Sequence, residues 1–92
     1  MATLHMDVES VQGAQSKMVQ EKEAMLGELT SLTSQINQTV GSAWIGQSAT
    51  EFQQQYEQLR TQITQQLDQL EQLATSLQSE IAQWTDMAAR MG

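Results

Sequence analysis

The 92-residue chain contains no cysteine and no proline. Without cysteine it can form no disulfide and carry out no thiolate chemistry, although this alone does not settle the compartment in which it works. Without proline, no residue forces a helix to stop, so long helices are favoured. A chain of this length forms one domain, in which the burial of apolar surface only narrowly offsets conformational entropy. Association with a partner is therefore an expected source of stability.

Basic residues are also scarce. Four of them stand against eleven acidic residues, which gives a net charge of −7, and the four form no stripe along the chain. Nucleic-acid binding is not expected, because phosphates require clustered positive charge. Anionic membrane surfaces are disfavoured for the same reason. The acidic balance is better explained as a means of keeping a glutamine-rich surface soluble.

Long apolar runs are missing as well. No stretch of the sequence approaches the roughly 18 residues that span a bilayer, so stable membrane insertion is not expected. The first residues lack the basic start and the apolar core of a signal peptide. Taken alone, these features predict a cytoplasmic protein.

The residue types that catalyse reactions or bind metals do not converge in the sequence. His5 is the only histidine and lies outside the periodic apolar pattern. Glu21, Glu23 and Glu28 lie close together, but they fall on the polar face of the predicted helix, where solvated charge is the simpler explanation. The sequence contains no nucleophile motif and no phosphate-binding glycine loop. We therefore expect neither an enzyme nor a metal or cofactor site.

Helix-breaking residues cluster only once, between Val40 and Ser48. Gly41 can adopt the left-handed backbone conformation that ends a preceding helix. Ser48 and Glu51 have the pattern of a capping box, which would start a second helix. Between the glycines of this segment lies Trp44, which is large enough to close the bend by packing across both helix ends. The segment is therefore predicted to be the turn of a hairpin.

The apolar pattern of the first half predicts one amphipathic helix. Asp7 can accept backbone hydrogen bonds at its start. From Val8 onward the apolar residues fall into three adjacent heptad columns, and Gln15 and Lys22 are the weak positions of the first column. Three columns make a stripe wider than the seam of a two-stranded coiled coil, so this helix is expected to face more than one neighbour.

The second half is more regular. From Ala49 to Met91 every seventh residue is apolar, without a break, and this column is predicted to be the main seam of the second helix. The neighbouring column is interrupted at Gln66 and Glu80. There the apolar surface is supplied one position further on by Leu67, Ala74, Ile81 and Ala88. The predicted core and interface residues of both helices are Val11, Met18, Met25, Leu29, Leu32, Ile36, Phe52, Tyr56, Leu59, Ile63, Leu70, Leu73, Leu77 and Trp84.

These patterns predict an all-α fold, an antiparallel two-helix hairpin that dimerises into a four-helix bundle. Residues 1–92 form one helical-hairpin domain, with a helix at about 8–40, a turn at about 41–47 and a helix at about 48–90. The hinge of one hairpin is expected near the open end of the other. At that open end, Trp84 is expected to pack near Leu4, His5 and Val8.

The turn also carries a resemblance to a known family. Trp44-Ile45-Gly46 stands near the middle of the chain, is preceded by Ala43 and is followed by Ala49 and Phe52. Together with the chain length and the flanking helices, this pattern resembles the WXG family of small helical-hairpin proteins exported by type VII secretion systems, the early-secretory-antigenic-target type.

The resemblance implies a non-enzymatic protein that leaves the cell without a cleaved signal peptide, to the medium or the cell surface. It implies pairing with a second copy or with a WXG-type paralogue, contact with a type VII secretion ATPase or effector, and a role in export for Trp44 and Gly46. The sequence departs from the family's C-terminal signal, a Tyr followed four positions later by an acid, because Tyr56 is followed by Arg60. An intracellular coiled-coil adaptor, or a secretion chaperone for a larger effector, has the same helical pattern. Presence in the medium without cell lysis separates the two hypotheses.

Overall fold

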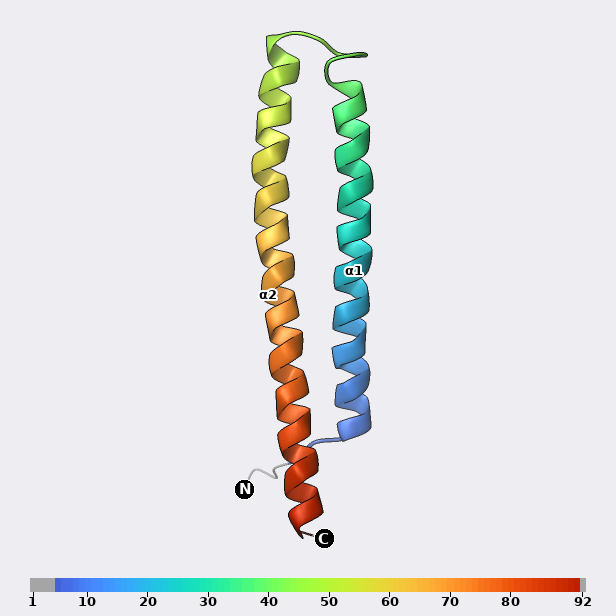
Figure 1. Cartoon of the computed structure of the whole chain (residues 1–92), viewed down its shortest axis with the longest axis vertical. Helices are drawn as coiled ribbons and strands as arrows, with labels where there is room; N and C mark the ends of the chain where they lie inside the picture. Colours follow the sequence, from blue (N-terminus) through green and yellow to red (C-terminus); the bar gives the residue numbers. More distant parts are fainter. Residues whose placement is uncertain (1–4, 92) are drawn as a thin grey trace.

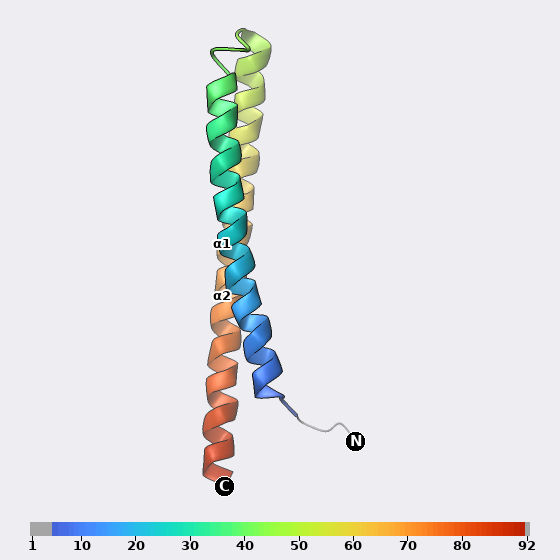
Figure 2. The same cartoon turned by 90° about the vertical axis from the view of Figure 1, so that its right-hand side faces the viewer.

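A computed structural model of the chain describes residues 5–91, which form an elongated antiparallel hairpin of 69 × 22 × 19 Å (Figure 1). Helix α1 runs from Val8 to Thr39 and helix α2 from Gln47 to Met91. The predicted two-helix fold is confirmed. Because α2 has 45 residues and α1 has 32, the C-terminal end of α2 extends beyond the start of α1. A second view shows that the helices twist gently around each other along their length (Figure 2).

The start of α1 is held by Asp7, as the sequence predicts. Its carboxylate accepts hydrogen bonds from the backbone N–H of Ser10 at 3.3 Å and from the Ser10 hydroxyl at 3.0 Å. A side-chain acceptor at this position satisfies a backbone donor that the first turn of a helix leaves free. The backbone hydrogen bond from Ser10, followed by the one from its hydroxyl, lowers the pKa of Asp7 below its usual value of 3.8.

The contribution of this cap is expected to depend on pH. Because the pKa of Asp7 is lower in the folded chain than in the unfolded chain, the cap stabilises the fold above the unfolded pKa and is lost as the pH falls through the folded pKa. The melting temperature of Asp7→Ala should therefore lie below that of the wild type at pH 7, and the gap should narrow as the pH falls below 3.8 and close once the pH is below the folded pKa. Asp7→Asn is the control, because its amide oxygen accepts at every pH. A gap between wild type and Asp7→Ala that is constant from pH 7 to pH 2 would contradict the assignment.

The turn depends on two glycines with positive φ. Gly41 has φ +95° and Gly46 has φ +134°, backbone conformations that other residues rarely adopt. Between them the chain is tied to the end of α1, since the Trp44 N–H donates to the Thr39 carbonyl at 3.0 Å. The Gly41 N–H in turn donates to the Trp44 carbonyl at 2.9 Å. These bonds fix the position of Trp44 relative to both glycines.

The capping box predicted for the second helix is not formed. Helix α2 begins at Gln47, so Ser48 lies inside the first turn. The Glu51 carboxylate accepts a hydrogen bond from the side-chain amide of Gln47 at 3.1 Å. The Gly46 carbonyl accepts the first helical bond, from the Thr50 N–H at 3.2 Å. Glycine is tolerated before a helix, and with Gly46 in the capping position the helix starts two residues earlier than the Ser48 capping pattern indicates.

The core of the hairpin is a narrow seam between the helices. Near the turn it contains the predicted seam residues Ala49 and Tyr56. Further along α2 the buried residues are Leu67, Ala74 and Ile81, the column that supplies apolar surface beyond the interruptions, while Leu70 and Leu77 are only half-buried. The face that α2 presents to α1 therefore shifts by one column along the helix.

Truncation of this seam is expected to be costly. Leu67→Ala should lower the free energy of unfolding by about 2–5 kcal/mol, because it opens a cavity at a residue with little room to collapse. Leu67 is 5% exposed, whereas Gln65, two residues earlier, is exposed and provides the control Gln65→Ala. Urea unfolding monitored by circular dichroism measures both variants. Equal shifts of the unfolding midpoint for the two would show that Leu67 is not in the core.

Lys22, a weak position in the sequence pattern, is buried in this seam. It is 9% exposed, and its Nζ lies 3.1 Å from a carboxylate oxygen of Glu71 on α2 and 3.9 Å from one of Glu23. The aliphatic stem of a lysine can cover apolar surface while the ammonium group reaches a polar partner. Lys22 thus replaces an apolar core residue and forms an ion pair between the helices.

Candidate partner-binding surface

Trp44 lies beside the turn, against the ends of both helices. Its ring is 5.4 Å from that of Phe52, centroid to centroid, with 48° between the ring planes, an arrangement favourable for aromatic pairs. The two rings line an apolar pocket of about 330 Å³, together with Leu32, Gln35, Ile36, Thr39 and Val40. Trp44 remains 40% exposed and Ile45, at the tip, is 76% exposed. The ring therefore bridges the helix ends, as predicted, while part of it stays accessible.

Large apolar side chains continue from this pocket along one side of the hairpin. Met25 and Leu32 on α1 and Phe52, Leu59 and Leu73 on α2 are all exposed, with exposed fractions from 39% to 60%. On each helix they recur at multiples of seven residues, and in an antiparallel pair the two columns point to the same side. We call these five residues, with Trp44, the apolar face.

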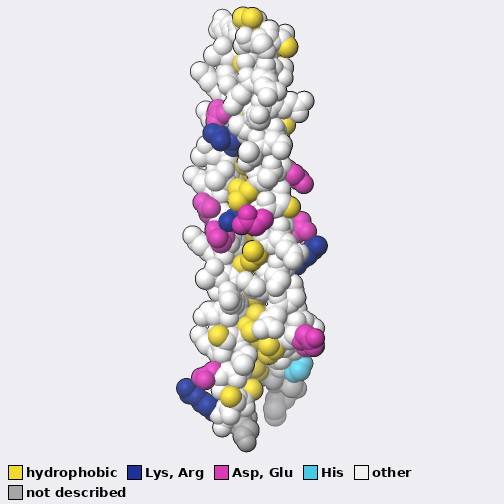
Figure 3. Space-filling model, turned by 45° about the vertical axis from the view of Figure 1, so that its right-hand side comes forward, with side chains coloured by type: hydrophobic (Ala, Val, Ile, Leu, Met, Phe, Trp, Pro, Cys, Tyr) yellow, Lys and Arg dark blue, Asp and Glu magenta, His cyan; other side chains and the backbone are white. Residues whose placement is uncertain are grey.

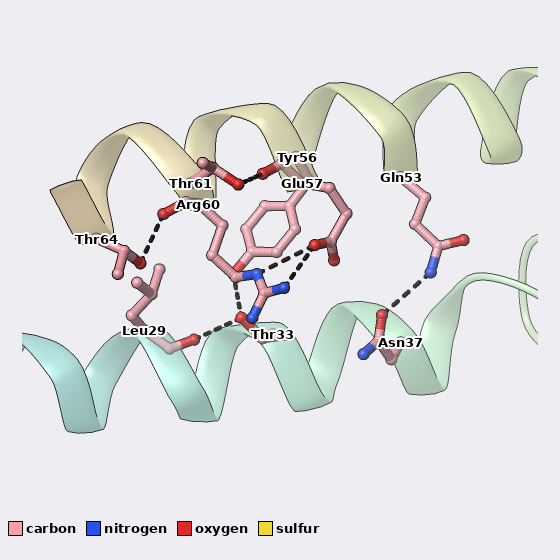
Figure 4. A network of polar contacts seen from close by, with 9 residues as sticks. All are labelled: Leu29, Thr33, Asn37, Gln53, Tyr56, Glu57, Arg60, Thr61 and Thr64. Carbon is pink, nitrogen blue, oxygen red and sulfur yellow. Dashed lines mark hydrogen bonds and ion pairs between the residues drawn. The ribbon is translucent and has the colours of Figure 1, made fainter.

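The register of the hairpin makes this face continuous. It is set by three contacts between the helices. The Tyr56 and Thr33 hydroxyls lie 2.6 Å apart, the Gln53 amide donates to Asn37 at 3.1 Å, and Lys22 pairs with Glu71 (Figure 4 shows the first two pairs of residues).

The exposed column of α2 consists of every seventh residue from Phe52 and is polar at Gln66 and Glu80. In this register, α1 has an apolar residue directly across from each of these polar positions. Met25 lies at the level of Gln66, and Val11 lies at the level of Glu80. Leu32 lies at the level of Leu59. The interruptions that the sequence shows in α2 are therefore filled by α1.

The opposite side of the hairpin is polar near the turn. A groove of about 630 Å³ lies between the helices, and hydroxyl and amide side chains, Arg60 and two leucines line it. The Arg60 guanidinium is held by Glu57 at 2.7 Å, and Asn37 and Gln53 are joined across the helices on this side (Figure 4). We call this region the polar groove; its lining residues are Leu26, Leu29, Thr30, Thr33, Ser34, Asn37, Gln38, Arg60 and Thr64.

The charged side chains form pairs within the chain. All four basic residues contact acids of the same hairpin, in the pairs Lys17–Glu21, Lys22–Glu71, Arg60–Glu57 and Arg90–Asp86, at 2.7 to 3.1 Å. Figure 3 shows one face on which acidic and basic side chains lie together, while apolar side chains emerge between the helices mainly in the lower half. Every basic side chain is therefore paired within the hairpin, and the net charge of −7 comes from the remaining acidic side chains.

The predicted core and interface residues fall into three groups. Tyr56 is buried, five belong to the apolar face, and eight are half-buried, namely Val11, Met18, Leu29, Ile36, Ile63, Leu70, Leu77 and Trp84. The register places Trp84 at the level of Val8, and Leu4 lies outside the described residues. Lys22 is the buried residue that the sequence pattern missed, whereas Ala49 belongs to the predicted main seam, and Leu67, Ala74 and Ile81 belong to the column predicted to supply the apolar surface beyond the interruptions.

Within residues 5–91, no group of three or more His, Cys, Asp or Glu side chains is arranged to hold a metal ion. In the same part of the chain, neither helix is long and apolar enough to cross a membrane. The described surface thus offers an apolar face and a polar groove.

The fold and this surface define a small, elongated all-α hairpin with a tryptophan turn and an exposed apolar face. The sequence profile of the family described as proteins of 100 residues with WXG (WXG100) matches residues 3–87, and the chain belongs to this family. The resemblance seen at Trp44 and Gly46 is thereby confirmed. Proteins of this family are small helical, non-enzymatic substrates of type VII secretion and generally form dimers. Comparison with curated proteins and with solved structures gives no significant match.

Proposed function

We propose that the chain is a non-enzymatic substrate of a type VII secretion system, exported as a homodimer through helix–helix association. The apolar face, with Trp44 at its hinge end, is the observation that carries the proposal. Monomeric soluble proteins rarely expose so continuous an apolar surface, and such surfaces mark sites of protein association.

The energetics favour association through this face. Fully burying one large aliphatic or aromatic side chain contributes about 1.5–3 kcal/mol relative to leaving it in water. Leu32, Leu59 and Leu73 are 48%, 52% and 60% exposed, so each retains much of this free energy for a partner. Two hairpins that stack their apolar faces form a four-helix bundle, the arrangement in which such faces are normally covered.

The role proposed for the turn rests on its exposure and rigidity. Trp44 is positioned by backbone hydrogen bonds to Thr39 and Gly41, and Gly46 holds a backbone conformation that favours glycine. A partly exposed aromatic ring on a fixed turn can be recognised by another protein at low entropic cost. The WXG family membership supports export as the process in which this recognition occurs.

Export is tested in the native host by comparing a strain with an intact type VII secretion ATPase and one in which that ATPase is inactivated. The proposal predicts the chain in the culture medium of the first strain and its retention in cells of the second. A cytoplasmic marker protein, measured in the same fractions, controls for lysis. Retention in the cells of both strains would contradict the proposal and favour an intracellular adaptor or secretion chaperone.

A further inference from the structure

We infer that the polar groove binds an extended, uncharged peptide segment of another protein, in which apolar side chains alternate with polar ones. The groove lies on the side of the hairpin opposite to the apolar face, so it stays open whether or not the apolar face is covered. Binding at this groove goes beyond the proposed homodimer and does not depend on it. Three features of the groove support it: the hydrogen-bonding groups that it presents, its dimensions and the charges at its rim.

The threonines of the groove use their hydroxyl protons within the helices. Thr30, Thr33 and Thr64 each donate to the backbone carbonyl four residues earlier in the same helix, at 2.8 to 2.9 Å. A hydroxyl has a single proton but two acceptor lone pairs, so these side chains offer a ligand oxygens that accept and methyl groups that pack. Leu26 and Leu29, which are half-buried, lie beside them in the groove. The groove therefore combines acceptors with a surface on which apolar side chains can pack.

The N–H donors of the groove come from Arg60 and Asn37. The Arg60 Nε and Nη2 atoms donate to one carboxylate oxygen of Glu57 at 3.1 and 2.7 Å, and a guanidinium has further N–H groups beyond these. The Asn37 side-chain oxygen accepts a hydrogen bond from Gln53 at 3.1 Å, while its amide nitrogen points away from Gln53 (Figure 4). A ligand with free carbonyl oxygens would satisfy these donors.

The dimensions of the groove fit an extended chain rather than a helix. Its lining on α1 runs from Leu26 to Gln38, which spans about 18 Å at the helical rise per residue. A volume of about 630 Å³ over this length gives a mean cross-section of about 35 Å². A helix with its side chains is about 10–12 Å wide and needs about twice that area or more, whereas about five residues of extended chain match the length. An extended segment also offers a free carbonyl and a free N–H at each residue, whereas a helix pairs most of its own.

The charges at the rim favour an uncharged segment. Glu57 is paired with Arg60 and the chain carries a net charge of −7, so an acidic segment would be repelled. A basic segment would come close to the Arg60 guanidinium, whose side chain is 44% exposed. Successive side chains of an extended chain point to opposite sides, so alternating residues can place apolar groups against the leucines and polar groups in water. Unstructured regions of other proteins can supply such a segment.

Titration of the isotope-labelled full chain with a synthetic peptide, followed by nuclear magnetic resonance, tests this inference. The probe has about five residues, in which leucine alternates with serine, and both of its ends are blocked so that it carries no charge. We expect saturable changes in the backbone amide signals of the residues that line the polar groove and in the side-chain amide of Asn37.

Two matched variants locate the binding site. Ser34→Phe places a ring in the groove and should weaken binding of the probe about tenfold or more. Ser31→Phe makes the same change at an exposed position of α1 that does not line the groove, and it should leave binding unchanged. Arg60→Met keeps the length of the side chain but removes its donors, so it should also weaken binding about tenfold. Circular dichroism verifies that each variant is folded.

The inference is overturned if the probe causes no saturable change, if the changes are confined to the apolar face, or if Ser34→Phe and Ser31→Phe bind the probe equally. Tighter binding of a probe with glutamate in place of one serine would overturn the uncharged class of ligand. Sedimentation of the same samples reports on the homodimer separately. Groove binding by a monomeric chain would support this inference and contradict only the homodimer, and a dimeric chain that does not bind the probe would contradict this inference alone.

Discussion

The Leu59→Glu variant is expected to sediment as a monomer at micromolar concentration, where the wild type sediments as a dimer. Leu59 is 52% exposed in the hairpin and lies in the middle of the apolar face. Because Leu59 is already half-buried in the hairpin, each copy loses about half of the roughly 1.5–3 kcal/mol that full burial of a leucine contributes, and by symmetry this loss occurs twice in one interface. Burying a carboxylate adds a further cost. The dimer dissociation constant should therefore rise by about 100-fold or more.

Gln58→Glu is the control for this substitution. It introduces the same charge at the neighbouring exposed position, which points away from the apolar face. We expect it to remain dimeric. Circular dichroism should show both variants to be helical, because neither residue is buried between α1 and α2. If Leu59→Glu stayed dimeric, or if Gln58→Glu dissociated equally, the apolar face would not be the interface.

Replacing Trp44 with phenylalanine is expected to reduce export several-fold without unfolding the protein. Phenylalanine keeps an aromatic ring against Phe52 in the pocket beside the turn, but it loses the indole N–H and one ring of the accessible surface. If the turn is recognised by the secretion machinery, export should fall while the helicity and the mass of the dimer are retained. The amount of protein in the medium of the native host is measured beside both properties.

Ile45→Ala provides the comparison at the turn. Ile45 is 76% exposed and lies next to Trp44, so its truncation alters the tip without removing either aromatic ring. We expect its export to stay close to that of the wild type. Normal export of a folded, dimeric Trp44→Phe protein would remove the argument for recognition of the indole and leave the turn with an architectural role only.

The hairpin itself is predictable from sequence because its signals are local or strictly periodic. Asp7 is followed by a helix whose first turn it caps, and Gly41 occurs where the backbone must take a positive φ. The heptad columns identify which residues are apolar enough to be covered. They do not distinguish the seam inside one hairpin from a face that awaits a partner, because both need apolar side chains at the same spacing.

The details that sequence reasoning misses depend on contacts between the helices. Lys22 is buried because Glu71, 49 positions later in the chain, lies within 3.1 Å of its ammonium group, and no local pattern reports this distance. The shift of the core to Leu67, Ala74 and Ile81 follows from the way the two helices twist around each other. The Ser48–Glu51 capping pattern fails because Gly46 offers an earlier start for α2.

The apolar face becomes evident only once the register is known. Gln66 and Glu80 appear in the sequence as breaks in a column of α2. Met25 and Val11 of α1 lie at the same levels and close these breaks in space. The candidate site is therefore a property of the pair of helices, and neither helix displays it alone.

The most direct test of this account is the native mass of the protein recovered from the culture medium of its host. We predict an assembly of twice the 10.3 kDa mass of the single chain, containing no other protein. Absence of the chain from the medium, or its recovery there as a monomer or bound to a different protein, would contradict the account.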